Sequence, residues 1–182
     1  MKATGIVRRI DDLGRVVVPK EIRRTLRIRE GDPLEIFTDR EGEIILKKYS
    51  PIGELGQFAK QYADSLNQTT GHIVAITDKD QFIAVAGPTK KDMITKGISH
   101  DLEEAINERE VVIAGKDDKN FIRILNDDDS EFMYQVITPI ISEGDAIGSV
   151  IILTKDAKTK FGDLENKLAG TAAAFLGRQM EQ

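Results

Sequence analysis

The sequence predicts an α+β protein of two domains joined by a linker helix. The first fifty residues hold short β-branched stretches between turn residues, with 12 Lys+Arg against 9 Asp+Glu for a net charge of +3. A Ser-Pro pair at 50–51 then opens a helical pattern, because serine is a good N-cap and proline suits the first helical position. The remaining residues alternate strands and helices, with 14 Lys+Arg against 22 Asp+Glu for a net charge of −8. We therefore expect domains at 1–50 and 71–182 and a linker helix at 51–70.

Composition indicates an ordinary globular chain of 182 residues with 40% hydrophobic and 31% charged residues. Cysteine is absent, which excludes disulfides, a thiolate nucleophile and cysteine-based zinc sites. The longest mostly apolar run, residues 146–153, is too short to span a bilayer, and the N-terminus has no apolar signal-peptide stretch. We expect a cytoplasmic protein with no membrane partner.

The first domain is predicted to begin with two strands, residues 4–10 and 15–18, around a turn at 11–14. Pro19 then favours a short helix over residues 20–26, because its missing N–H would be unpaired in the first helical turn.

A hairpin follows, with strands at 34–37 and 44–46 around a turn at 39–42. Four short strands and a two-turn helix bury little surface by themselves. We therefore expect residues 1–50 to form a homodimer, which would also double the arginines on one face.

The linker helix carries apolar residues at helical spacing along one stripe. One interpretation is packing onto the following domain, and the other is self-association. For the second interpretation the candidate oligomerisation residues are Leu55, Phe58, Tyr62 and Leu66.

The second domain reads as strands in the middle with helices at both ends, which predicts one antiparallel sheet backed by helices. The helix expected over 90–109 is weakened at Gly97 and divides near Ser99, and the final helix should turn Leu164 and Phe175 inward. The expected strands lie at 72–77, 81–86, 111–114, 121–125, 132–141 and 146–154.

No motif argues for catalysis, for a bound cofactor or for a metal site. His72 and His100 lack a second histidine at ligand spacing, which favours solvated or capping roles. The acidic run 127–130 lacks the glycine spacing of an EF-hand and reads as a surface loop, and residues 87–91 read as a turn into a helix. We predict that the protein is not an enzyme.

Arginines are the informative feature of the first domain. The first 29 residues hold 9 basic against 3 acidic side chains, and Arg23 and Arg27 share one helix face. Arginine offers a flat, permanently charged donor fork that suits phosphate oxygens and guanine edges. This pattern favours double-stranded DNA as the partner.

Residues 2–19, KATGIVRRIDDLGRVVVP, resemble the start of the AbrB-type transition-state regulators. The stretches at 21–26 and 44–49 carry the same resemblance. It implies a dimeric swapped-hairpin β-barrel in which two chains interlace. It also implies DNA contacts by the matching Arg8, Arg15, Arg23 and Arg24; with less weight we add Lys2, Arg9, Lys20 and Arg27.

The rest of the chain resembles the second domain of the stage V sporulation protein T family, through residues 50–56, the turn before 147–148 and the ending at 175–182. The resemblance implies a GAF domain, a tetramer built from dimers, and activation and repression of forespore genes late in sporulation. The cysteines and histidines of chromophore-binding and sulfoxide-reducing GAF domains are missing, so the sequence does not name a small-molecule ligand.

Two other functions stay open at this point. The swapped-hairpin unit could be an antitoxin whose main partner is another protein, although an ordered domain stands where such antitoxins carry a disordered tail. Alternatively, the GAF-like half could be a ligand carrier or an enzyme, with DNA binding secondary.

Overall fold

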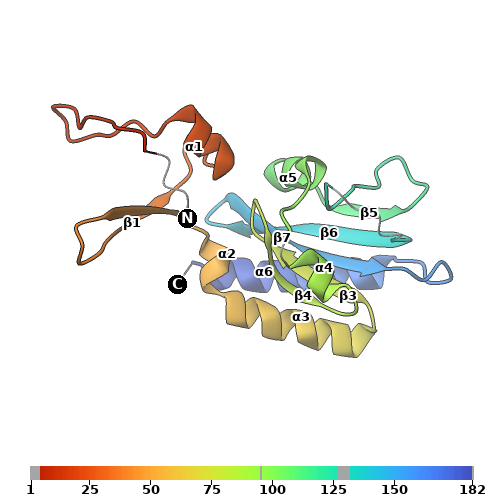
Figure 1. Cartoon of the computed structure of the whole chain (residues 1–182). Helices are drawn as coiled ribbons and strands as arrows, with labels where there is room; N and C mark the ends of the chain where they lie inside the picture. The colour runs from red at the N-terminus through yellow and green to blue at the C-terminus, as the bar shows by residue number, and fades with distance from the viewer. Residues whose placement is uncertain (1–4, 95, 127–131, 182) are drawn as a thin grey trace. The chain divides into compact units, whose positions relative to one another are not determined.

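A computed structural model describes residues 5–94, 96–126 and 132–181. The chain divides into two compact units, the first ending at Tyr49 and the second beginning at Ser50 (Figure 1).

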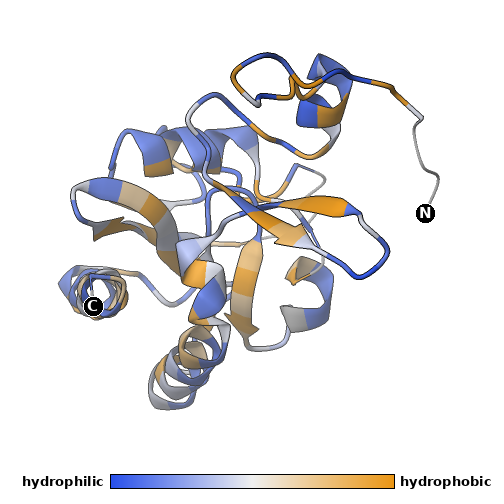
Figure 2. Cartoon of the chain, turned by 90° about the vertical axis from the view of Figure 1, so that its left-hand side faces the viewer, coloured by the Kyte–Doolittle hydropathy of each residue, from blue (hydrophilic) through white to orange (hydrophobic). Residues whose placement is uncertain are grey.

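Over its described residues, 5–49, the first unit contains one short helix and one hairpin. Helix α1, Lys20–Thr25, lies within the predicted range. Strands β1, Leu34–Thr38, and β2, Ile44–Lys48, pair antiparallel with Ile36 opposite Leu46. The hairpin strands are coloured mostly hydrophobic in Figure 2. The sequence prediction is confirmed for these three elements.

The two strands predicted at 4–10 and 15–18 are absent over the described residues 5–18. Only their turn is formed: Gly14 N–H donates to the Asp11 carbonyl at 3.0 Å, and Asp11 N–H donates to the Arg15 carbonyl at 3.0 Å. A β-branched stretch becomes a strand only when another strand completes its hydrogen-bond ladder, and the described part of the single chain supplies no such strand here.

The second unit is built on one five-stranded sheet with the order β4-β3-β7-β6-β5, every neighbouring pair antiparallel. This confirms the predicted single antiparallel sheet. Its strands are β3 Ile73–Thr77, β4 Phe82–Ala86, β5 Val112–Gly115, β6 Tyr134–Ser142 and β7 Asp145–Thr154.

Helices cover both faces of this sheet (Figure 1). One face packs against α2, Pro51–Glu54, with α3, Gly56–Thr70, and α6, Asp163–Gln179. The other face packs against α4, Lys90–Met93, and α5, His100–Asn107. Successive strand residues therefore point to opposite faces of the sheet and belong to two separate apolar clusters.

Residues 51–70, expected as a linker, pack as part of the second unit. Ser50 caps α2 by accepting from the Gly53 N–H at 3.1 Å, as the Ser-Pro pair predicts. Ala59, Ala63 and Leu66 are buried against the sheet, so the apolar stripe of α3 serves packing first.

The helix expected over 90–109 forms two pieces, as Gly97 predicts, and Ser99 caps the second by accepting from the Leu102 N–H at 3.0 Å. The strand expected over 121–125 is wrong, since only an isolated bridge pairs Leu125 with Ile98. Its carbonyls are instead satisfied by Ser99, whose N–H donates to Ile124 at 3.0 Å and whose hydroxyl donates to Arg123. A backbone segment whose carbonyls find such partners outside a sheet does not need a strand ladder to satisfy them.

Candidate nucleic-acid interface

The four arginines matched by the AbrB resemblance are all exposed and lie on three segments of the first unit. Arg8 precedes the turn at 11–14 and Arg15 follows it. Arg23 and Arg24 occupy the last turn of α1. A charged side chain that fills no core position is available to a polyanion.

Asp11 fixes the conformation of the first turn and the direction of Arg15. Its Oδ1 accepts from the backbone N–H groups of Leu13 at 3.0 Å and Arg15 at 2.8 Å, while its Oδ2 accepts from Arg15 Nε at 2.8 Å. The Arg15 backbone N–H, followed by its guanidinium, lowers the pKa of Asp11. Because the carboxylate bonds to Nε and the Arg15 side chain is 69% exposed, the terminal guanidinium nitrogens remain accessible as donors to a phosphate.

Helix α1 ends in a left-handed residue. Arg27 has φ of 51°, and beyond it the Ile28 N–H donates to the Arg23 carbonyl at 2.8 Å. This is the pattern of a Schellman C-cap, in which glycine is the usual residue. Arg9, Lys20 and Arg27, the second-rank candidates, are exposed, and Lys2 lies outside the described residues.

The first unit also exposes an unusual number of large apolar side chains. Val7 is 90% exposed, Val17 71% and Ile36 69%. Exposed apolar surface of this extent marks a candidate interaction site. The exposed apolar set is Ile6, Val7, Ile10, Leu13, Val16, Val17, Leu26, Ile36, Phe37, Ile44, Ile45 and Leu46.

The candidate oligomerisation residues of the second unit separate into exposed and buried members. Phe58 is 50% exposed, and Tyr62 stacks on Phe175 of α6 with ring centroids 5.5 Å apart. Leu55 is half-buried. Leu66 is buried in the core, so its side chain is withdrawn from any surface of this unit.

Sequence reasoning placed two residues of α6 on the wrong side. Leu164 is 66% exposed and Phe175 is 37% exposed, although both were expected to point inward. The inner face of α6 is instead made of the small residues Ala169, Ala172 and Ala173 with Leu176, which lets the helix lie close to the sheet. Leu164 and Phe175 are eleven residues apart, which places them on nearly the same side of a helix, and this spacing was the available signal for a second apolar face.

The described residues hold no group of three His, Cys, Asp or Glu side chains able to bind a metal ion. His100 is exposed. His72 packs edge-on against Phe161, with ring centroids 4.8 Å apart, so it is a packed residue rather than a solvated or capping one. The acidic run 127–130 lies outside the described residues, and in the part of the chain that is described no helix combines the length and apolarity of a membrane span.

Comparison with known families assigns the chain. Residues 54–181 match the family described as stage V sporulation protein T C-terminal, transcription factor. The chain belongs to this family. It is 57% identical to stage V sporulation protein T of Bacillus subtilis strain 168 over 182 residues, covering 100% of both chains.

The first unit has its own relatives. Residues 7–54 match the family described as antidote-toxin recognition MazE, bacterial antitoxin. Over 51 residues the chain is 67% identical to the transition state regulatory protein AbrB of Bacillus subtilis strain 168. The aligned stretch covers 28% of this chain and 52% of AbrB. The AbrB-type first domain predicted from sequence is thereby confirmed.

The second unit has the GAF fold. The GAF domain of an Acinetobacter phosphoenolpyruvate-protein phosphotransferase superposes with a TM-score of 0.58 at 10% identity, covering 74% of this chain and 84% of that one. Taken with the family, these relationships make the chain a sporulation transcription regulator with DNA as its partner, and not an enzyme.

Proposed function

We propose that the first unit binds duplex DNA through Arg8, Arg15, Arg23 and Arg24, mainly by contacts to phosphates. The observation that carries this proposal is the exposure of all four side chains in an otherwise acidic protein. Phosphate contacts supply most of the affinity and set register, while base readout is modest and favours deformable sites. Arg9, Lys20, Arg27 and Lys2 add to the positive field.

We infer that two copies of the first unit form the swapped-hairpin barrel. Residues 5–10 and 15–18 are rich in β-branched side chains and form no strand with the described part of the single chain, and large apolar side chains among them are exposed. A second copy would supply the strands that complete these ladders and would cover the apolar surface in one step.

The second unit, in this proposal, joins such dimers into a tetramer through an aromatic surface made of the exposed Phe58 and Phe175 with the half-buried Tyr62. A sensory role is compatible with this arrangement. A small molecule would alter DNA affinity only by binding two arrangements of the oligomer unequally. The regulator would act in the cytoplasm of the forespore, activating some late sporulation genes and repressing others.

The DNA-binding proposal is tested by fluorescence anisotropy of a labelled duplex at several salt concentrations. Arg23→Ala should lower affinity at least tenfold and reduce the slope of log K against log salt by about 1 for each phosphate that the side chain neutralises in the wild type. Arg40→Ala is the matched control, because Arg40 is an exposed arginine of the hairpin turn and should change affinity less than twofold. A folded Arg23→Ala protein that binds as wild type would reject the assignment.

The tetramer proposal is tested by light scattering. Phe58→Asp should reduce the mass from tetramer to dimer and leave the first unit assembled. Leu66→Ala is its contrast, since a buried position should lower stability without altering the mass. An unchanged mass for Phe58→Asp at micromolar concentration would remove α3 from the interface.

The antitoxin match over residues 7–54 favours a second candidate, in which the first unit binds another protein. The same exposed apolar side chains could be covered by a protein partner. The salt titration separates the two, because a protein-binding module would show no steep, salt-dependent affinity for any duplex.

A further inference from the structure

Helix α1 carries two of the four arginines, yet its own packing does little to fix its direction. It has six residues, none of them buried, and Leu26 beyond it is 53% exposed. A helix this short has no intrinsic stability in water. Contacts outside the helix must therefore decide where Arg23 and Arg24 point.

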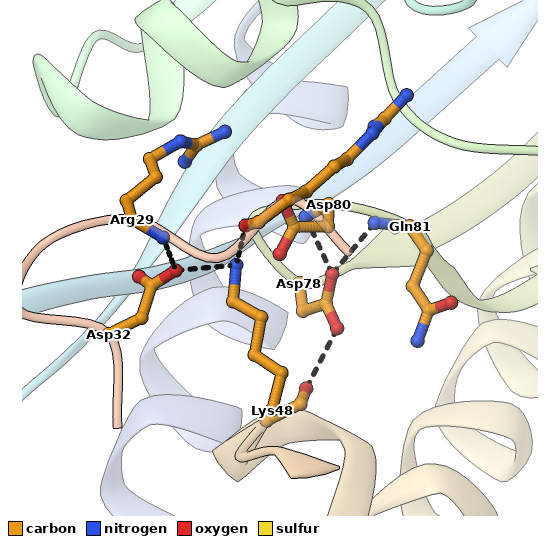
Figure 3. A network of polar contacts seen from close by, with 8 residues as sticks. Arg29, Asp32, Lys48, Asp78, Asp80 and Gln81 are labelled. Carbon is orange, nitrogen blue, oxygen red and sulfur yellow. Dashed lines mark hydrogen bonds and ion pairs between the residues drawn. The ribbon is translucent and has the colours of Figure 1, made fainter. Parts of the chain in front are cut away.

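A polar clamp closes on the C-terminal end of α1. Lys48 Nζ, at the end of β2, donates to the Arg27 carbonyl at 3.0 Å and lies 2.9 Å from Asp32 Oδ2 (Figure 3). The same Asp32 oxygen accepts from the Arg29 backbone N–H at 2.8 Å. All four groups belong to the first unit, and together they tie the segment after α1 to the hairpin.

Both charged members of the clamp are largely withdrawn from water. The Lys48 side chain is 22% exposed and that of Asp32 is 16% exposed. Burial by itself raises the pKa of Asp32, but hydrogen bonds from the Arg29 N–H and from Lys48, with the charges of Lys48 and Arg29, outweigh it and lower the pKa. Removing one member of such a largely buried ion pair leaves the other as an uncompensated charge, which destabilises the contact.

We propose that Lys48 and Asp32 are positioning residues for DNA binding, which hold α1 so that Arg23 and Arg24 face the phosphates. Neither side chain needs to touch DNA in this arrangement. The proposal rests on the assignment of the arginines made above, and it adds an acidic residue whose presence favours binding to an anion.

The sign of the effect at Asp32 makes the proposal testable. Removing a negative charge near a DNA-binding surface should, by electrostatics alone, strengthen binding to DNA. If the clamp holds α1, removing the same charge should weaken binding, because the helix loses its anchor. The two accounts therefore predict opposite directions for one substitution.

The experiment uses the full-length protein and the labelled duplex. Asp32→Asn should weaken binding at least fivefold with the salt slope unchanged, since every phosphate contact is retained. Glu30→Gln is the matched control: it removes the same charge from an exposed position of the same loop, and binding should stay equal or become slightly tighter. Lys48→Met should weaken binding like Asp32→Asn, and Lys48→Arg, which keeps the charge and the donors, should restore it.

Hydrogen–deuterium exchange supplies a readout that a general loss of stability would not give. In Asp32→Asn, exchange should rise in the peptide covering 20–30 and stay as in wild type over the hairpin 34–48 and the second unit. Should Asp32→Asn unfold the first unit, Asp32→Glu decides, because it keeps the charge but lengthens the side chain, and weaker binding is again expected.

Several outcomes would overturn the proposal. A folded Asp32→Asn protein that binds DNA as tightly as wild type, or more tightly, would do so. If Asp32→Asn unfolds the first unit, wild-type DNA affinity of Asp32→Glu would do so instead. If Asp32→Asn left DNA affinity unchanged while Lys48→Met reduced the slope of log K against log salt by about 1, Lys48 would instead be a direct phosphate contact. Failure of the arginine assignment is recognised separately, by Arg23→Ala binding as wild type.

Discussion

The two units of the chain differ in how much of their apolar surface they bury within the single chain. The second unit buries two apolar clusters on the faces of one sheet and satisfies most of its backbone within itself. The first unit leaves large apolar side chains exposed and is fixed by turns, a helix cap and the Lys48–Asp32 clamp. The second unit therefore covers most of its apolar side chains within one chain, whereas the described part of the first unit leaves a large share of them exposed.

The largest expected effect comes from placing a charge on the exposed apolar surface of the first unit. If Ile36 stays exposed to solvent in the assembled protein, Ile36→Asp would change the free energy of unfolding by only about 0.5 kcal/mol. If a second copy covers Ile36, the variant should dissociate the dimer and lower DNA affinity at least tenfold, because an unpaired carboxylate would be buried.

Light scattering and anisotropy check this prediction. Lys119→Gln is the control, because it gives the same change of net charge in an exposed loop of the second unit and should leave both readings unchanged. An intact, DNA-binding oligomer of Ile36→Asp would show that this side chain stays exposed in the assembly.

The next largest effect is expected from a glycine substitution in the second unit, which should lower stability more than one in the first unit. A Cβ on Gly177 would lie 2.0 Å from the Ile141 carbonyl oxygen, so Gly177→Ala must push α6 away from β6 and should cost about 3 kcal/mol. Gly14 has φ of +76° with no atom within 4 Å of a Cβ, so Gly14→Ala should cost only about 1 kcal/mol of backbone strain. Urea denaturation measures both, and equal costs would contradict the contrast between close packing and turn conformation.

Acid should weaken the first unit through Asp32. Since its folded pKa is lowered, the stability that it contributes is present above the ordinary aspartate pKa of about 3.9 and is lost as pH falls through the lowered value. Asp32→Asn should therefore be about 1 kcal/mol less stable than wild type near neutral pH, and this difference should shrink toward pH 2. A pH-independent difference in unfolding free energy would argue against the clamp as an ion pair.

The smallest effect is expected at the turn between β6 and β7. Glu143 and Gly144 form a two-residue loop with φ of 48° and 88°, since Ser142 pairs with Asp145. Asn-Gly is the preferred sequence for this geometry, so Glu143→Asn should raise stability by about 0.5 kcal/mol. Thermal unfolding should show the gain in the second unit, and Glu143→Val, a β-branched residue at positive φ, should show a loss.

Local signals in the sequence were sufficient for most elements. Ser50 and Ser99 mark helix starts, Gly97 marks the break before α5, and the hairpin strands follow their apolar pattern. The strand prediction for residues 121–125 was wrong, because the same apolar run also suits a loop whose carbonyls accept hydrogen bonds from Ser99. Periodicity reports burial, and it does not report which partner satisfies the backbone.

The candidate site was predictable in part. Arg8, Arg15, Arg23 and Arg24 could be named from the sequence because they belong to a long motif. Asp32 and Lys48 could not, since they are sixteen residues apart and meet only because the hairpin returns β2 to the loop after α1. Neither residue carries a local pattern that distinguishes it from a solvated charge.

The sequence by itself determined the two-part organisation, the helix starts, the hairpin, the basic first unit and the family motif. These are local or compositional properties, which a linear chain carries in full. Only the tertiary structure decided that α3 packs on the sheet, that α6 leaves Leu164 and Phe175 outside, and that residues 5–18 have no strand partner within the described single chain. Each of these depends on which surfaces meet in space, and contacts between residues distant in sequence have no signature in local spacing.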